Sequence, residues 1–476
     1  VGSYCPATRQ SREAEESSDT HFPLTRIEQA MTNTAAAIAT PARPAASPAY
    51  AWFVVAVLCV AGIVSYIDRQ VINLLVEPIK ADFGINDTQI GLLQGFSFVV
   101  FYAVLAIPLA RLADSGNRTR IITIGVVCWS LATFSCGLAG SFAMLFAARM
   151  FVGVGEATLT PAGYSLISDY FPKERIALAV SIFTGCGFAG SGIAYAFGGA
   201  LIEYFSQFER IVLPLVGERS VWQATFIAVT LPSALVMSLL FFVREPPRKE
   251  SLGDGKSPDS SFRAVVAHLL LHRRLFGGVL FGLTMMAAAS YAVNLWVPTY
   301  FLRVHGWTPM EIGSVFGAMV FLCSTGGVFI GGAVASAWMR RGQHDANLRV
   351  PIIAAVLAIP FAIAFPLVSD PTVSLVLLGP LLFLAVVPFG CGTAVLPIIS
   401  PNRLRAQVVA IYLLIANLLA FTCGPTSVGM LTDYVFRDPA LIGYSLAIAP
   451  AAFITAGCAL VGLALSPYSI VVKASE

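Results

Sequence analysis

Charged residues are scarce in this chain. Asp, Glu, Lys and Arg make up 12% of its 476 residues, whereas hydrophobic residues make up 57%. Soluble globular proteins carry about 25% charged residues, so this composition excludes a soluble globular fold. The net charge of +3 is small and no dense Lys/Arg block is present, which excludes nucleic acid as a partner. The composition predicts a protein of the lipid bilayer.

Arrangements that carry metal or covalent chemistry are also missing from the sequence. The nine cysteines are scattered, without a Cys-x-x-Cys pair or metal-ligand spacing. No histidine falls in the core of an apolar run, and Ser165 and Ser168 have no histidine near them. We therefore expect no metal, no cofactor, no catalytic residue and no histidine proton relay, and we predict that the chain is not an enzyme.

Long apolar runs are what the chain has in abundance. A helix needs about 20 apolar residues to cross the hydrocarbon core of a bilayer. The runs predict an all-α membrane protein with twelve transmembrane helices, in two sets of six. Their expected positions are 51–79, 89–111, 120–139, 141–169, 176–205 and 221–243, then 275–303, 309–339, 349–368, 371–400, 403–434 and 440–466.

Polar segments flank and divide the two bundles, which we expect at 51–243 and 275–466. Residues 1–50 form a tail without the apolar core of a signal peptide, and a natural start at Met31 would make residues 1–30 a leftover of the expression vector. The Ser-, Gly-, Pro- and Lys-containing linker covers 244–274, and a second tail covers 467–476. Twelve of the 29 Lys and Arg residues fall in these segments, and ten more fall in the short loops on the same side of the membrane. The positive-inside rule then places both termini and the linker in the cytoplasm, with the helices in the inner (plasma) membrane.

Four ionisable residues lie inside the predicted spans, Asp68 and Arg69 in the first and Arg149 and Glu156 in the fourth. A charge at this depth is costly unless it faces a partner or a cavity, so each is a candidate functional residue. At about 1.5 Å per residue, Arg69 falls between Glu156 and Arg149 in depth. We predict that these four form a substrate and proton site, with Glu156 as the coupling carboxylate and Arg69 and Arg149 as the anion-holding pair.

A structural interpretation of these charges stays open. Buried ion pairs also fasten neighbouring helices together, and Asp68 points away from Arg69 around the helix. A contact with another span therefore explains Asp68 as well as a functional role does.

The second half of the chain has no ionisable residue in the centre of its predicted spans. Its polar and aromatic residues, with three from the first half, are predicted to line the substrate cavity: Tyr66, Asn73, Tyr102, Tyr291, Asn294, Trp296 and Tyr300. A passage with one charged wall and one aromatic wall suits an amphipathic anion. Ordinary core packing is an equally good explanation for the aromatics.

The segment ARLADSGNR (110–118), between spans two and three, resembles the loop signature of the major facilitator superfamily. The matching residues are Asp114, Gly116, Arg118 and Arg120. A degenerate second copy lies at 331–342, where Gly332 and the pair Arg340 and Arg341 are kept. The resemblance implies the major facilitator fold of two pseudo-symmetric six-helix bundles, alternating access and a monomer. It also implies a role for the first loop as the cytoplasmic gate.

Within that superfamily, the segments 66–114, 149–172 and 244–248 (REPPR) look like the spinster group. This resemblance implies transport of a lysophospholipid or a sphingosine-phosphate-like anion, coupled to protons, with membrane lipids around the protein. It also carries the substrate and proton site onto Asp68, Arg69, Arg149 and Glu156. The short loops and Ala-rich composition suggest a bacterial member.

Two other functions stay open. A proton/organic anion symporter of the hexuronate-like type shares the Asp-Arg element of span one, and a membrane receptor that transports nothing is a third reading. His268 and His272, four residues apart in the linker, have the spacing of metal ligands, but a basic amphipathic helix at the cytoplasmic interface explains them better.

Overall fold

Helices make up nearly all of the computed structural model, which describes residues 47–208, 211–214, 216–247, 262–401 and 404–475. Residues 1–46 of the predicted amino-terminal tail and 248–261 of the predicted linker lie outside the described residues, as does the side chain of Asp114. The first half comprises α2 (Pro48–Gln70), η1 (Val71–Leu74), α3 (Val76–Phe83), α4 (Asp87–Gln94), α5 (Phe96–Ser115), α6 (Arg118–Gly137), α7 (Phe142–Glu156), α8 (Leu159–Tyr170), α9 (Lys173–Ser206), β1 (Ile211–Leu213), β2 (Gly217–Arg219), α10 (Val221–Val229) and α11 (Leu231–Phe241).

The second half begins with α12 (Phe262–Leu271), the helix predicted around His268, and the long α13 (Arg273–Val304). It continues with α14 (Pro309–Met319), η2 (Val320–Ser324), α15 (Thr325–Arg340), α16 (Ala346–Ala364), η3 (Phe365–Leu367), α17 (Pro371–Ala385), α18 (Val387–Cys391), η4 (Gly392–Ala394), α19 (Val395–Ile399), α20 (Arg405–Met430), η5 (Leu431–Phe436), η6 (Pro439–Leu441) and α21 (Ile442–Ser475). The segments η2 and η5 are π-helical, and the other η segments are 3₁₀ helices.

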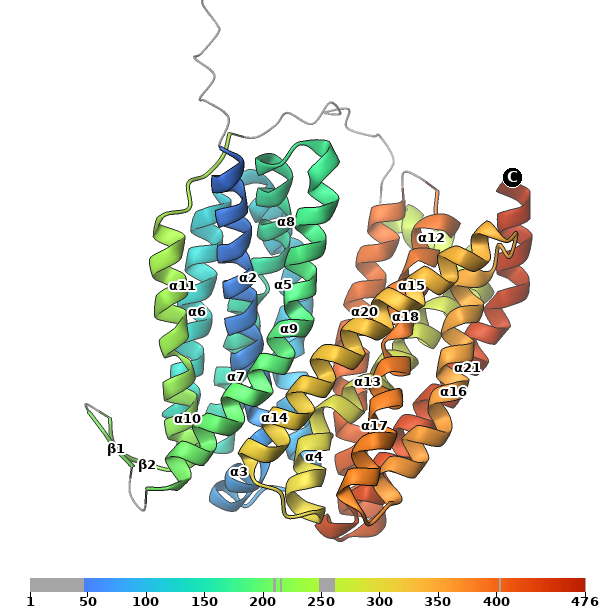
Figure 1. Ribbon diagram of the computed structural model, residues 1–476. Coiled ribbons are helices and arrows are strands. Elements are labelled where there is room, and N and C mark those ends of the chain that lie inside the picture. The colour runs from blue at the N-terminus through green and yellow to red at the C-terminus, as the bar shows by residue number, and fades with distance from the viewer. Residues whose placement is uncertain (1–46, 209–210, 215, 248–261, 402–403, 476) are drawn as a thin grey trace, which may run out of the picture. The chain divides into compact units, whose positions relative to one another are not determined.

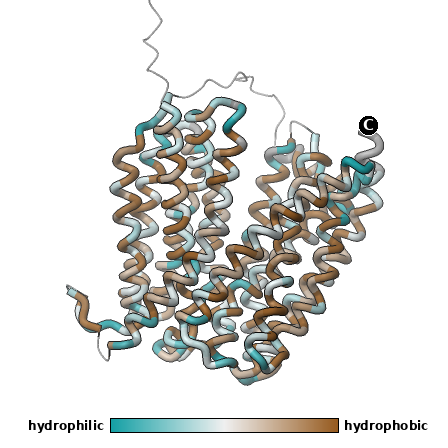
Figure 2. Tube along the Cα trace, in the orientation of Figure 1, coloured by the Kyte–Doolittle hydropathy of each residue, from teal (hydrophilic) through white to brown (hydrophobic). Residues whose placement is uncertain are grey.

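The prediction of twelve spans is confirmed. In the described part of the chain, twelve helical stretches are long and apolar enough to cross a membrane. The first ends at Leu74 rather than at 79, because α3 is a separate short helix that begins at Val76. The sequence also gave no signal for the antiparallel hairpin in which Ile211 of β1 pairs with Arg219 of β2. Figure 2 shows apolar residues along the helices and hydrophilic ones gathered toward their ends.

The six spans of each half pack together as a bundle, within one compact unit that starts at Pro48 (Figure 1). We call the side where α2 begins and α11 ends the linker face, and the side of α3 and the hairpin the far face. The two bundles touch where α9 packs on α14 and where α4 and α5 pack on α20. A Cβ on Gly192 of α9 would lie 2.5 Å from the carbonyl oxygen of Gly317 in α14, so this contact requires glycine.

Two spans of the first half are broken near mid-chain. The α-helix of span one ends at Gln70 and continues as the 3₁₀ segment η1. Span four is broken between Glu156, the last residue of α7, and Leu159, the first of α8. Pro161 in the first turn of α8 has no N–H to continue the α7 ladder, which explains the second break. Both breaks place chemistry-bearing residues at helix ends, where backbone groups need partners.

Candidate functional site

Arg69 and Glu156 form an ion pair between spans one and four. The Nη2 of Arg69 donates to Oε2 of Glu156 at 2.5 Å, and the Ser65 hydroxyl donates to the same oxygen at 2.7 Å. The Glu156 side chain is fully buried, whereas 13% of the Arg69 side chain is exposed. The sequence placed these residues at similar depth, and the structure brings them into contact. Their part in binding substrate or protons stays a prediction.

Arg149 is bound to backbone at the broken end of α2. Its Nη1 donates to the carbonyl oxygen of Asp68 at 2.9 Å and its Nη2 to that of Arg69 at 3.3 Å. The side chain is fully buried. A cation at a helix C-terminus satisfies unpaired carbonyls and the negative end of the helix dipole. In this conformation Arg149 therefore caps α2, a role that the sequence did not indicate.

Asp68 is buried among helices α2, α6 and α7. Neither carboxylate oxygen has a partner of standard hydrogen-bond geometry among the described residues, although the Thr133 hydroxyl lies beside it. Buried polar atoms usually have partners, so an unpartnered carboxylate needs an explanation. The position of Asp68 away from Arg69 agrees with the expected helix geometry.

Aromatic rings enclose the Arg69 guanidinium. Its central carbon lies 4.3 Å from the ring centroid of Phe98, 5.0 Å from Tyr66 and 5.3 Å from Tyr102. In the second bundle, the tilted rings of Tyr291 and Phe421 have centroids 3.9 Å apart, and the Phe421 ring lies 6.2 Å from that of Phe98. Phe98 and Phe421 are site neighbours that the sequence analysis missed, because nothing in an apolar run marks which face meets Arg69.

A buried polar network continues from the site toward the far face. The Asn73 amide donates to the Tyr195 hydroxyl at 3.1 Å, and that hydroxyl donates to the carbonyl oxygen of Asn294 in the second bundle at 2.8 Å. Thr299 of the same helix donates to the Asn73 carbonyl at 3.3 Å. Gln70 joins the network by donating to Ser191 at 3.2 Å. These contacts connect the broken end of span one directly to α13.

The predicted cavity residues of α13 have differing surroundings. Tyr291 is partly exposed and lies within electrostatic reach of Arg69. The Asn294 side chain donates to Ser290 of its own helix. Trp296 and Tyr300 are fully buried, with hydrogen bonds to the Pro425 carbonyl at 2.8 Å and to His305 at 3.0 Å. In this conformation Trp296 and Tyr300 face packed neighbours.

The predicted gate residue Arg118 is held within the first bundle. Its guanidinium binds Asp169 and Glu245, the latter at 2.7 Å, and donates to the Ser165 carbonyl at 3.1 Å. Burial raises the pKa of Glu245, but hydrogen bonds from the Thr119 N–H and from Arg118 outweigh it and hold that pKa below its usual value. Arg118 thus fastens α6 to the ends of α8 and α11. Of the other predicted gate residues, Gly116 ends α5 as its C-cap and Arg120 is exposed.

A second ionic cluster joins the bundles at the far face. Arg303 of α13 contacts Glu77 at 2.6 Å and Asp87 at 2.8 Å, and Lys80 also pairs with Asp87. Asp433 of η5 accepts hydrogen bonds from the N–H and the hydroxyl of Thr88 at 2.6 Å each. We call these five charged residues the far-face clasp. The sequence analysis missed it because these residues are far apart in the sequence and meet only through tertiary packing.

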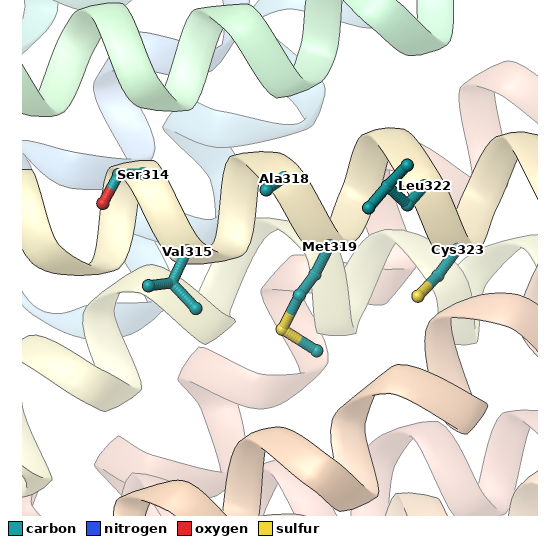
Figure 3. A pocket seen from close by; sticks show the side chains of 6 residues that line it. All are labelled: Ser314, Val315, Ala318, Met319, Leu322 and Cys323. Carbon is teal, nitrogen blue, oxygen red and sulfur yellow. The ribbon is translucent and has the colours of Figure 1, made fainter.

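A groove of about 500 Å³ lies on α14 and η2, away from these charges. It is lined by Ser314, Val315, Ala318, Met319, Leu322 and Cys323, and Figure 3 shows Val315, Met319 and Cys323 projecting from one side of the helix. Its walls carry no ionisable group except the Cys323 thiol, so the groove does not compete with the charged cluster as the candidate site.

The described residues form twelve helices of membrane-spanning length in two bundles, with paired charges buried in one of them, which is the architecture of a membrane transporter. A sequence profile of the Major Facilitator Superfamily matches residues 58–425, and the chain belongs to that family. Within it the chain is spinster-like. It is 26% identical over 436 residues to protein spinster homolog 3 of Danio rerio, covering 86% of this chain and 84% of the relative.

Further relatives agree with this placement. A "sphingosine-1-phosphate transporter SPNS2" of Xenopus tropicalis is 26% identical and a "MFS-type efflux pump" of Mycolicibacterium smegmatis is 27% identical, covering 86% and 82% of this chain and 80% and 86% of those proteins. The crystal structure of a bacterial homologue of the human lysosomal transporter Spinster, in an inward-facing and unoccupied conformation, matches with a TM-score of 0.73. That match has 27% identity and covers 90% of this chain and 98% of the other. A D-xylose-proton symporter, at 16% identity and a TM-score of 0.58, shares the fold.

Proposed function

We propose that this protein is a secondary active transporter of an amphipathic anion, a lysophospholipid or a sphingosine-phosphate-like molecule, driven by protons through alternating access. The observation that carries the proposal is the Arg69–Glu156 ion pair. Arg69 is the partly exposed member, rings of the first bundle surround it, and one of them, Phe98, lies 6.2 Å from Phe421 of the second bundle. A guanidinium is well suited to a phosphate, and the rings suit the apolar part of such a molecule.

Charge balance couples protons to the anion. Two arginines and two carboxylates are neutral together when both acids are ionised. A proton on Glu156 leaves one positive charge and weakens the hold of Glu156 on Arg69, and an anion that binds Arg69 restores neutrality. Proton binding and anion binding therefore favour each other, and linkage makes that effect reciprocal.

Asp68 is proposed to carry a second proton. Its carboxylate is fully buried, and the nearby Arg149 is hydrogen-bonded to backbone. A buried carboxyl group without a hydrogen-bond partner is much less costly when neutral than when ionised. The competing role for Asp68 is a purely structural contact with α6.

The bundle contacts support an assignment of state and orientation. The glycine contacts of α9 with α14 and the far-face clasp join the two bundles, and the matched spinster homologue is described as inward-facing. The protein is proposed to lie in the inner (plasma) membrane with both termini and the linker face on the cytoplasmic side. In that orientation the conformation described here is proposed to be inward-facing. The transporter is proposed to act as a monomer, with a small substrate, protons and bilayer lipids as its partners.

A hexuronate-like symporter is the second candidate. It shares the acid and arginine arrangement, but a short polar anion needs hydrogen-bond donors from both bundles. On the side of the second bundle, the rings of Tyr291 and Phe421 pack together, and Phe421 lies 6.2 Å from Phe98 beside Arg69, which favours a substrate with an apolar part.

Uptake into proteoliposomes separates the candidates. Purified protein is challenged with a panel of lysophospholipids and a panel of hexuronates, each with and without an inward proton gradient. The proposal predicts gradient-dependent uptake of a lysophospholipid and no uptake of hexuronates. Gradient-driven hexuronate uptake without lysophospholipid uptake would overturn the proposal in favour of the hexuronate-like symporter. No uptake of any compound from either panel would also overturn it, in favour of a receptor that transports nothing.

A further inference from the structure

Span seven begins with two adjacent arginines that lack an acidic partner. Arg273 and Arg274 open α13 at the linker face, one residue after the end of α12. Both side chains are exposed, and neither forms an ion pair with the residues that the structure describes. By contrast, Arg349 at the start of α16 pairs with Asp345 at 2.7 Å. Two guanidinium groups side by side attract an anion, and their planar donors match the geometry of a phosphate.

The surface that precedes these arginines is apolar and exposed. In the last turn of α12, Leu270 is 65% exposed and Leu271 is 78% exposed, whereas Val265 of the same helix is buried in the core. Figure 1 shows α12 at the linker-face end of the second bundle. A short helix at a membrane surface that turns leucines outward, beside arginines, is suited to the boundary between lipid headgroups and acyl chains.

Helix α13 continues this surface into the membrane. Arg273, Gly277 and Phe281 follow one another at a spacing of four residues and so lie on roughly one side of the helix. Phe281 is exposed, and a Cβ on Gly277 would meet no neighbouring group within 4 Å. At about 1.5 Å per residue, Gly277 lies about 6 Å and Phe281 about 12 Å deeper than Arg273. This side of α13 therefore presents positive charge at the membrane surface and open apolar surface below it.

We infer that Arg273 and Arg274 bind the phosphate of an anionic phospholipid of the surrounding bilayer, with an acyl chain along Gly277 and Phe281. Basic residues at a membrane surface attract anionic lipids, whereas a zwitterionic headgroup brings a cation of its own that the arginines repel. The ligand is a two-chain lipid that stays bound, so the inference does not depend on which molecule is transported. A lipid at this site holds the linker end of α13, whose other end joins the first bundle through Arg303.

The test measures lipid affinity by native mass spectrometry of the full chain in a neutral detergent. The two probes are phosphatidylglycerol and phosphatidylcholine with the same acyl chains. The first variant is Arg273→Gln/Arg274→Gln. Its matched control is Arg340→Gln/Arg341→Gln, which removes the same charge from another exposed arginine pair, at the end of α15.

A second pair of variants tests the acyl chain contact. Gly277→Leu fills the open surface below the arginines. Gly462→Leu on α21 is its control, because a Cβ there also meets no neighbouring group within 4 Å. All of these positions are at least partly exposed, so the variants are expected to fold, and thermal unfolding in detergent checks that they do.

Wild type is expected to bind phosphatidylglycerol more tightly than phosphatidylcholine. Arg273→Gln/Arg274→Gln is expected to lower the affinity for phosphatidylglycerol roughly ten- to thirtyfold and to remove the preference. Arg340→Gln/Arg341→Gln is expected to keep the preference. Gly277→Leu is expected to weaken the binding of phosphatidylglycerol, and Gly462→Leu is expected to leave it unchanged.

Three results would overturn the inference. Equal affinity of wild type for the two lipids would show that the arginines do not select an anionic headgroup. Equal losses in the two arginine variants would show that only the net charge of the protein matters. Displacement of phosphatidylglycerol by inorganic phosphate, together with unchanged affinity in Gly277→Leu, would assign the arginines to a free phosphate. None of these measurements involves transport, so the proposed function is tested separately.

Discussion

At the scale of single residues, Glu156 and Arg69 carry the chemistry, because one proton decides whether Arg69 has an anionic partner. We predict that Glu156→Gln abolishes the dependence of transport on the proton gradient, since glutamine keeps the shape of the side chain but does not titrate. Arg69→Ala is expected to abolish uptake at every pH. Uptake against external pH in proteoliposomes measures both. An unchanged pH profile in Glu156→Gln would remove this residue from the coupling role.

Arg149 has a different role from Arg69, because its guanidinium donates hydrogen bonds to the carbonyl oxygens at the end of α2. Arg149→Met leaves two buried carbonyl groups without donors, which costs roughly 3 kcal/mol of unfolding free energy. We expect a lower thermal midpoint in detergent and loss of transport. Arg120→Met, at an exposed site, is the control and should stay within about 0.5 kcal/mol of wild type. Equal midpoints for the two variants would contradict the capping role.

At the scale of elements, the π-helical η5 aims Asp433 across the bundle interface at the first turn of α4. Asp433→Ala removes the acceptor of the Thr88 N–H. We predict faster hydrogen–deuterium exchange at the start of α4, because its first turn loses a cap supplied by the other bundle. Asp438→Ala, which uncaps η6 at the Ala440 N–H, should leave α4 exchange unchanged. Unchanged exchange in Asp433→Ala would show that the far-face clasp does not depend on this contact.

Glu245 ties three helix ends together at the linker face through Arg118 and the Thr119 N–H. Because folding lowers the pKa of Glu245, its contribution to stability is fully present above the pKa of the unfolded chain, near 4.5. It is lost as the pH falls through the still lower pKa of the folded state. The stability gap between wild type and Glu245→Gln, about 1–2 kcal/mol at pH 7, should therefore shrink below pH of about 4.5.

Thermal unfolding across pH measures that gap, with Glu203→Gln on α9 as the control. A gap that stays constant into acid would show that the charge of Glu245 contributes nothing to the contact.

At the scale of the whole molecule, the sequence predicts what apolar length and embedded charge determine. The predicted bounds of the spans lie within a few residues of those in the structure. The depth estimate correctly placed Arg69 at about the depth of Glu156. The sequence did not predict that Arg149 binds backbone carbonyls or that Arg303 and Asp87 form an ion pair between the bundles. Such pairings depend on helix rotation and on tertiary packing. The ring of Phe98 over Arg69 was missed for the same reason. Phe98 is one of many phenylalanines in an apolar run, and only its contact with Arg69 distinguishes it.

The central claim is that substrate binding and protonation of Glu156 are linked. Its most direct measurement is proton uptake by the purified protein in weakly buffered detergent solution when a lysophospholipid is added. Wild type is predicted to take up protons on binding, and Glu156→Gln is predicted to bind the lipid with a clearly smaller uptake. Binding by wild type without proton uptake, or the same uptake in Glu156→Gln, would contradict the account.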